Sequence, residues 1–540
     1  MCTIAARRAA RACMQLDNSA AFPGCTPSGL AGWLAAAMAS PVSGDRATVK
    51  TIEQALDAAG FGAFQIKLFV LCGLGWSADV GEIRLIGFLL DGHTLEFQLS
   101  PSEKWVLSAI FFVGMFLGAW VWGIVADRCG RKHAFTATCC LTFTFGSGSA
   151  LANSATALAM CRFAVGLGLG GNLAVDFSMF LEYLPSEYRG RATVWLTGWS
   201  AVGNIWASAL AWAVIPSFGW RPYVVLCAAP LLPAMILRLG VKESPRYLLI
   251  SGRPAEAAEV IVDIARGNGR LGQLPRTSES GGAGFDIEVT TDTDAVREMR
   301  GSWRLLCSYS ILRSLLPLCL IWFCISAGFY GQSINLPSFL RQKNLSEEEG
   351  YLGVLLAVCA EIPGVVLGGY LVDRIGRIVT LRLAMLGCSC MLLLFSLVTT
   401  VHGVMAVTVA FEFASSMVWG AAYLYTPEVL PTPIRAVGLG ACSATTRVAG
   451  MLSPGLGQML SARDMLGESI LLYALIYAVG ACLTCALSVE TSGQALSDGT
   501  MPSSDRDRSE TTPLVSGTNT VDGKSGRKGY APVATDPSRP

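Results

Sequence analysis

Several ionisable residues of this sequence fall inside long apolar stretches. Asp79 and Glu82 are three residues apart and would share one face of a helix, while Glu361, Glu412 and Arg447 lie in three other stretches. Each charge would cost roughly 2.5–3.5 kcal/mol at the centre of a bilayer, so these residues must face one another or a wet cavity. A carboxylate withdrawn from water binds a proton more readily, which suits these acids to carrying protons.

The sequence leaves two interpretations of these charges open. In the first, Asp79 or Glu82, with Glu361 as the second choice, couples proton entry to the movement of a solute through a cavity at mid-depth. In the second, Arg84 and Arg447 only neutralise the acids in a static network. The residues predicted to hold the substrate or the coupling ion are Asp79, Glu82, Asn172, Asp176, Tyr330, Glu361, Glu412 and Arg447.

Arg447 has two further roles that are compatible with the sequence. Its cation could receive a solute carboxylate, which would favour organic anions such as aromatic or pyridine carboxylates, or it could pair with Glu361 or Glu412. Other polar and aromatic side chains of the same stretches could line the cavity, namely Trp76, Asn204, Gln332 and Asn335.

A second set of charges is repeated along the chain. The string GIVADRCGRK, at 123–132, returns as GGYLVDRIGR, at 368–377, with an offset of 246 residues between the two Asp-Arg pairs. Two more elements keep or nearly keep this register: Glu182 to Arg189 returns as Glu428 to Arg435 with an offset of 246, and Glu243 returns as Glu490 with an offset of 247. A long internal period of this kind indicates one membrane unit written twice.

The repeated charges predict a gate at one membrane face. Asp127 and Asp373 each lie where a predicted span meets its loop, beside basic residues. Ion pairs among the repeated residues would lock this face in the outward-open state, and the alternative is that they only fix the topology. The predicted gate consists of Asp127, Arg128, Arg131, Glu182, Arg189, Asp373, Arg374, Arg377, Glu428 and Arg435.

The charges inside the apolar stretches do not follow the repeat. The offset of 246 relates Asp79 to Ile325, Asp176 to Ala422, Glu361 to Met115, Glu412 to Gly166 and Arg447 to Ala201. The scaffold is therefore duplicated, whereas the predicted chemistry is not.

The elements that must position these residues are transmembrane helices. The chain is 52% hydrophobic and 15% charged with a mean hydropathy of +0.50, which is far from soluble composition. About 20 apolar residues cross a bilayer, and about twelve stretches reach that length, which predicts an all-α membrane protein with two halves of six helices. The stretches lie near 66–90, 105–125, 135–152, 157–181, 193–215 and 222–240, and near 315–338, 351–372, 380–400, 404–427, 437–459 and 467–488.

Basic residues orient the predicted spans. Arg and Lys gather in the loops that hold the repeated strings and in the long central connection, while the opposite loops hold few, so both termini are predicted to be cytoplasmic. The predicted organisation is a disordered extension at 1–60, a first half at 61–245, a linker with a short surface helix at 246–304, a second half at 305–490 and a disordered tail at 491–540. Asn344 begins an Asn-Leu-Ser sequon in a loop predicted to be outside, and is therefore a candidate glycosylation site.

The repeated G-x-x-x-D-R-x-G-R/K string resembles the signature of the major facilitator superfamily. RFAVGLGLGG at 162–171 and ESPRYL from Glu243 resemble its sugar-porter and organic-ion branch, and AEIPG at 360–364 and YTPEVLPTPIRAVGLG at 425–440 resemble synaptic-vesicle-two-related proteins. Arg84 departs from that pattern, because those relatives have an apolar residue there. The resemblance covers about 60–490 and implies twelve helices and transport by alternating access.

The function predicted from the sequence is secondary active transport of a small organic solute, an organic ion, by proton-coupled symport. A sugar or polyol porter or uniporter is the alternative within transport, and a receptor or vesicle scaffold without transport is the alternative outside it. No G-x-x-x-x-G-K-[ST] loop occurs and the chain holds only three His, so no enzyme, metal or cofactor is predicted. The predicted partners are the solute, protons and the lipid bilayer of a plasma membrane or an intracellular vesicle or organelle, with no nucleic acid, and the chain is expected to work as a monomer.

Overall fold

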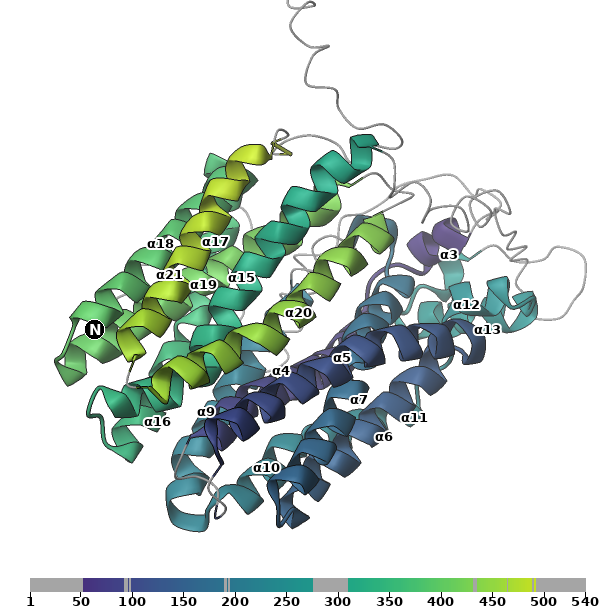
Figure 1. The fold of residues 1–540 in the computed structure, drawn as a ribbon. Helices are drawn as coiled ribbons and strands as arrows, with labels where there is room; N and C mark the ends of the chain where they lie inside the picture. Colours follow the sequence, from purple (N-terminus) through teal and green to yellow (C-terminus); the bar gives the residue numbers. More distant parts are fainter. Residues whose placement is uncertain are drawn as a thin grey trace, which may run out of the picture. The chain divides into compact units, whose positions relative to one another are not determined.

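The structure is a computed structural model, and it describes residues 52–91, 96, 99–188, 192, 195–274, 309–430, 435–463, 465–487 and 490–491. Within these ranges the secondary structure is helical and no strand occurs (Figure 1). The first half contains α4 (Ala63–Leu90), α5 (Pro101–Cys129), α6 (Arg131–Gly148), α7 (Ala155–Glu182), α9 (Trp199–Phe218), α10 (Trp220–Ala228) and α11 (Leu231–Leu239). The second half contains α15 (Tyr309–Gln342), α16 (Glu347–Cys359), α17 (Glu361–Ile375), α18 (Arg377–Leu397), α19 (Val401–Val429), α20 (Arg435–Ser461) and α21 (Leu466–Leu483). Short 3₁₀ turns lie at Ser149–Leu151, Ser186–Tyr188, Leu271–Gln273 and Thr484–Ala486.

Each of the predicted spans coincides with a helix or with a broken pair of helices. Among the described residues, nine helical segments are long and apolar enough to cross a membrane. Helices α6, α7 and α20 occupy the other three predicted positions and are not among these nine, so the count of twelve spans stays a prediction. The helices follow one another in the same order in both halves, from α4 to α11 and from α15 to α21, as the repeat in the sequence predicted.

Two of the spans are interrupted by proline. α10 and α11 meet near Pro230, and α16 gives way to α17 at Ala360, just before Pro363. Proline lacks the N–H that a continuing helix needs, whereas the first turn of a new helix does not use that donor. The break therefore makes Glu361 the first residue of α17, at a helix N-terminus in the middle of a span.

Glycine sets the distance between α5 and α7. A Cβ on Gly166 would lie 2.1 Å from the carbonyl oxygen of Phe111, and one on Gly170 would lie 2.0 Å from that of Met115. The reciprocal contacts come from Gly114 and Gly118 on α5, which approach backbone atoms of α7 equally closely. The glycine-rich string is thus a packing device, in agreement with the way small residues let membrane helices approach.

A group of short helices covers the predicted cytoplasmic end of the first half (Figure 1). α13 (Pro254–Gly267) lies at the predicted surface helix, and α12 (Pro245–Ile250) and α3 (Ile52–Ala59) pack against it. The Asn268 side chain ties them to α4, because it donates to the carbonyls of Ala59 and Gly60 and accepts from the Phe64 amide. The predicted disorder of 1–60 therefore does not hold for 52–59, which are helical because Ala55 and Leu56 bury an apolar face. Residues 1–51, 275–308 and 492–540 lie outside the described residues.

Candidate functional site

Arg84 joins the two halves of the molecule at mid-depth. Its guanidinium lies 3.5 Å from the Glu361 carboxylate and 3.2 Å from the Glu412 carboxylate, and all three side chains are almost fully buried. The same guanidinium donates to Asn204 Oδ1 at 3.2 Å and to the Ser333 hydroxyl. Arg84 is therefore the centre of a network that connects α4 and α9 of one half with α15, α17 and α19 of the other.

Glu361 of the second half is held by two side chains of the first half. Besides Arg84, the Asn204 amide donates to both of its carboxylate oxygens, at 2.9 and 3.1 Å. Its place at the N-terminus of α17 adds the favourable end of a helix dipole to a buried anion. Glu412, by contrast, has one carboxylate oxygen, Oε2, that is buried and has no hydrogen-bond partner. The network thus contains two acids and one cation, and it carries a surplus negative charge if both acids are ionised.

A second buried cluster lies inside the first half and has the same composition. Arg162 of α7 pairs with Glu82 at 2.7 Å, and both side chains are fully buried. Asp79 accepts a hydrogen bond of 2.6 Å from Asn172, while its other oxygen has no partner. Arg162 pairs with Glu82 alone, and among the described residues no cation lies within ion-pair distance of Asp79.

Arg447 lies apart from both clusters. In the part of the chain that the structure describes it has no carboxylate within ion-pair distance, and its buried Nε has no hydrogen-bond partner. The ion pairs that Arg447 could form with Glu361 or Glu412 are not formed, because both acids pair with Arg84. Arg447 instead interacts electrostatically with Tyr330 and Tyr423.

Aromatic rings surround these two tyrosines. Tyr330 lies 4.9 Å from Phe112 of the other half and 5.5 Å from Phe329, measured between ring centroids. Tyr423 lies 4.9 Å from Trp322 and stacks on Trp419 at 5.8 Å. A half-buried guanidinium beside a group of flat rings is suited to a small aromatic or carboxylate-bearing solute.

The other predicted site residues have different places. Asn335 donates to the Gly331 and Pro454 carbonyls and accepts from Gln458, so it is satisfied within the second half and serves packing. Gln332 is buried, and the Asp176 side chain lies outside the described residues. Asn344 lies in an exposed turn with a φ of 65°, and Ser346 of its sequon caps α16.

Sequence reasoning missed a fully buried cation, Arg162. It opens the string RFAVGLGLGG, which was interpreted through its glycines alone. The signal that could have found it is a charge at the start of an apolar span that already contains Asn172, facing a helix with two acids. The sequence singles out Arg84 and Asn204, but it does not predict that both bind Glu361 of the other half.

The repeated charges form the same arrangement in each half. Arg131 bonds Asp127 at 3.1 Å and Glu182 at 3.5 Å. Arg377 bonds Asp373 at 3.7 Å and Glu428 at 3.0 Å. These pairs stay within their own half, so in this structure they hold each half together rather than joining the two.

The last pair of repeated charges, Glu243 and Glu490, caps the start of a helix in each half. Glu243 accepts from the Lys132 amide at 3.1 Å at the start of α6, and Glu490 accepts from the Arg377 amide at 2.8 Å at the start of α18. Gly130 precedes the first of these helices with a φ of 100°, and a Cβ there would lie 2.3 Å from the Glu243 carboxylate. Of the remaining predicted gate residues that the structure describes, Arg128 and Arg374 do not join these pairs. Arg128 is exposed, Arg374 lies over the Tyr370 ring, Arg189 lies outside the described residues and so does the Arg435 side chain.

A family model provides the decisive comparison. The model described as Major Facilitator Superfamily matches residues 68–454, which is more than half of the chain. The chain belongs to the major facilitator superfamily. It is therefore a multi-pass membrane transporter, as the duplicated charge motifs and the buried ions indicated.

Curated relatives agree with this assignment. The chain is 30% identical over 488 residues to organic cation/carnitine transporter 7 of Arabidopsis thaliana, covering 83% of this chain and 96% of that protein. It is 32% identical over 436 residues to the niacin transporter NiaP of Acinetobacter baylyi, covering 81% and 96%. It is 31% identical over 476 residues to the synaptic vesicle 2-related protein of Bos taurus, covering 83% and 82%.

Solved structures show the same fold. The partially occluded inward-open xylose transporter XylE from E. coli matches 81% of this chain and 100% of its own with a TM-score of 0.65 at 18% identity. The fold class predicted from the sequence, the major facilitator fold, is thereby confirmed.

Proposed function

We propose that this transporter moves a small organic ion bearing a carboxylate together with a proton. The observation that carries the proposal is the charge balance of the buried site: each cluster holds two acids and one arginine, while Arg447 has no acidic partner among the described residues. Buried charges are tolerated only when they are compensated. A proton on one acid and a carboxylate beside Arg447 would supply what the chain lacks.

Asp79 is the best candidate for the coupling residue. It is fully buried and holds one hydrogen bond among the described residues, whereas Glu82 is paired with Arg162 and Glu361 is held by three contacts with Arg84 and Asn204. An acid with few fixed partners can gain and lose a proton without dismantling a network. The surplus charge around Glu361 and Glu412 provides a second place for the proton.

Arg447 and its neighbouring rings are the best candidate for substrate recognition. Its guanidinium offers paired donors to a carboxylate, and the rings around Tyr330 and Tyr423 offer flat apolar surface. The names of two relatives, a niacin transporter and an organic cation/carnitine transporter, fit a solute that carries both a carboxylate and a positively charged or aromatic group. The synaptic vesicle 2-related relatives favour an intracellular vesicle membrane. The cytoplasmic placement of both termini, the glycosylation of Asn344 and the monomeric state belong to the same proposal.

Uptake into proteoliposomes tests the proposal. The full chain is supplied with a panel of carboxylates, cations and sugars, with and without an inward proton gradient. We expect the gradient to stimulate uptake of a carboxylate, the Asp79→Asn variant to lose that stimulation while still exchanging solute, and Arg447→Gln to lose the carboxylate substrate.

Other outcomes would contradict the proposal. Uptake of sugars alone without response to the gradient would favour a uniporter, and no uptake of any solute would favour a receptor. Stimulation that persists in Asp79→Asn and disappears in Glu361→Gln would move the coupling role to the second cluster.

A further inference from the structure

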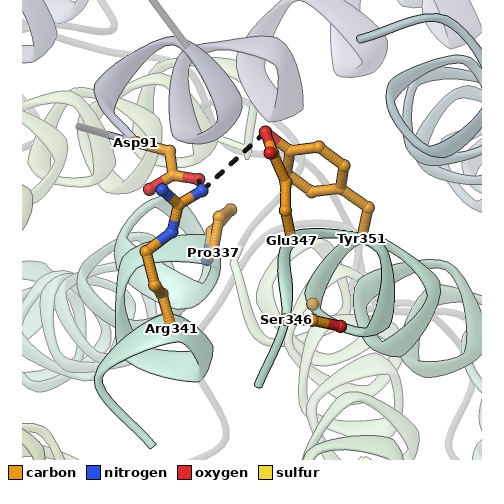
Figure 2. A pocket seen from close by; sticks show the side chains of 7 residues that line it. Asp91, Pro337, Arg341, Ser346, Glu347 and Tyr351 are labelled. Carbon is orange, nitrogen blue, oxygen red and sulfur yellow. Dashed lines mark hydrogen bonds and ion pairs between the residues drawn. The ribbon is translucent and has the colours of Figure 1, made fainter. Parts of the chain in front are cut away.

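An ion pair joins the two halves at the end opposite the repeated charges. Arg341, at the end of α15, lies 2.5 Å from the carboxylate of Asp91, which follows α4, and Asp91 is only 3% exposed. Glu347, at the start of α16, lies 3.9 Å from the same guanidinium. Figure 2 shows the three side chains converging on one small recess. This group is called the outer cluster below.

The surroundings of the outer cluster hold its members in place. The Tyr351 hydroxyl donates to Glu347 at 3.2 Å, and the Tyr351 ring lies edge-on to Phe88 of the other half at 5.4 Å. Lys104 interacts electrostatically with both Asp91 and Arg341. Among the described residues two acids thus face two cations, unlike the two clusters at mid-depth.

The outer cluster lies on the line along which the halves meet. Pro337 stands 246 residues after Asp91, and both residues line the same recess. Because parallel repeats are related by an axis along the membrane normal, equivalent residues near that axis face each other. A second Asp in place of Pro337 would set two like charges together, so an attractive pair here requires the two halves to differ.

Other contacts between the halves are found at the same end. The Trp105 indole donates to the Met451 carbonyl at 3.1 Å, and a Cβ on Gly87 would lie 2.8 Å from the Ile334 carbonyl oxygen. Asp91 lies seven residues beyond Arg84, roughly 10 Å along the helix direction at about 1.5 Å per residue. The outer cluster therefore separates the mid-depth network from the predicted outer face.

We propose that Asp91 and Arg341 form an outer gate, an ion-pair latch that must separate before a solute can enter from the outer face. The inference rests on transport by alternating access. Opening the seam between α4 and α15 pulls Asp91 and Arg341 apart and delivers both charges to water, whereas closing it buries Asp91 against its partner. The gate stabilises the state in which the outer end is closed.

The accessibility of one added cysteine tests the gate. Ile334→Cys places a thiol at the closed seam between α4 and α15, where the native side chain is 2% exposed. The full chain in lipid nanodiscs is labelled with a water-soluble maleimide, and the rate is corrected with the parent chain, which carries the native cysteines alone. We expect Asp91→Asn and Arg341→Gln to raise the rate at position 334 at least fivefold.

Two controls separate loss of attraction from loss of folding. The charge-exchanged chain, Asp91→Arg with Arg341→Asp, is made in a Lys104→Gln, Glu347→Gln background so that neither new charge meets a like charge, and it is expected to label within twofold of that background. Glu347→Gln, at a longer distance and with its side chain 45% exposed, is expected to change the rate less than twofold. Parental labelling in both single variants, or fast labelling in the charge-exchanged chain, overturns the gate. Labelling needs no substrate, so this result is independent of whether a carboxylate and a proton are transported.

Discussion

The repeated charges at the predicted cytoplasmic end and the unrepeated charges along the seam obey different rules. Each repeated arginine, Arg131 or Arg377, finds both of its acids within its own half. Arg84 finds both of its acids in the other half, and the acid nearest to Arg341, Asp91, also lies in the other half. A device that works inside one half can be copied without change, whereas a pair that spans the axis between the halves must be asymmetric.

The same rule explains which residues replace the seam charges. The register relates Arg84 to Tyr330 and Asp91 to Pro337, so neither charge meets its own copy. Tyr330 instead contacts Phe112 of the first half and faces Arg447. The seam therefore carries recognition and gating, while the repeated end preserves the architecture of each half.

Among the variants proposed, removing Arg84 should reduce stability and uptake the most. Arg84→Gln leaves Glu361 and Glu412 buried without their shared cation, and losing one partner of a buried pair costs about 3–5 kcal/mol. We expect little folded protein and no uptake, measured by thermal unfolding of the purified chain and by proteoliposome uptake. Arg447→Gln is the matched control, since it has no acidic partner among the described residues and should keep its stability. Equal loss of stability in both variants would contradict the central role of Arg84.

Removing Glu361 and Glu412 together with Arg84 tests whether their uncompensated charge causes the loss of stability. The triple variant Arg84→Met, Glu361→Gln, Glu412→Gln removes the cation and both acids together, and should recover most of the stability lost in Arg84→Gln while remaining inactive. Recovered uptake would show that the network is structural and plays no part in transport.

Replacing either capping glutamate should lower the stability by an intermediate amount that is the same in each half. Glu243→Gln and Glu490→Gln weaken charge-assisted bonds to the first amides of α6 and α18, each at a cost of about 1–2 kcal/mol. Paired melting curves of the two variants provide the measurement. A cost in one half that exceeds the other more than twofold would show that the repeated end is no longer equivalent in the two halves.

Asp127 should show the smallest effect on stability. Its side chain is 69% exposed, and an exposed pair with Arg131 contributes less than about 1 kcal/mol. We expect Asp127→Asn to insert and melt as the parent does, yet to lower the rate of uptake if the repeated charges also lock the cytoplasmic face in the other state. Asp373→Asn is the matched variant, and normal uptake in both would leave these charges with a topological role alone.

Much of the fold followed from local features of the sequence. Apolar stretches of about 20 residues marked the helices, and the repeated Asp-Arg strings showed that the chain contains two related halves. Four of the acids that break the register, Asp79, Glu82, Glu361 and Glu412, are buried, whereas Arg447 is half-buried. The interruption of a span at Glu361 was not predicted, because a proline in an apolar stretch is compatible with a kink or with a new helix.

The sequence by itself determined the positions of the helices, their duplication and four of the buried acids, because hydropathy and repetition can be read along the chain. Only the tertiary structure decided the partners: Arg84 rather than Arg447 for Glu361, and Arg162 for Glu82. Those choices depend on the rotation and depth of helices that are far apart along the chain, and on which half each helix faces. Ion pairs between the halves form only when the halves assemble. The sequence repeat shows that there are two halves, but it does not show which residues pair between them.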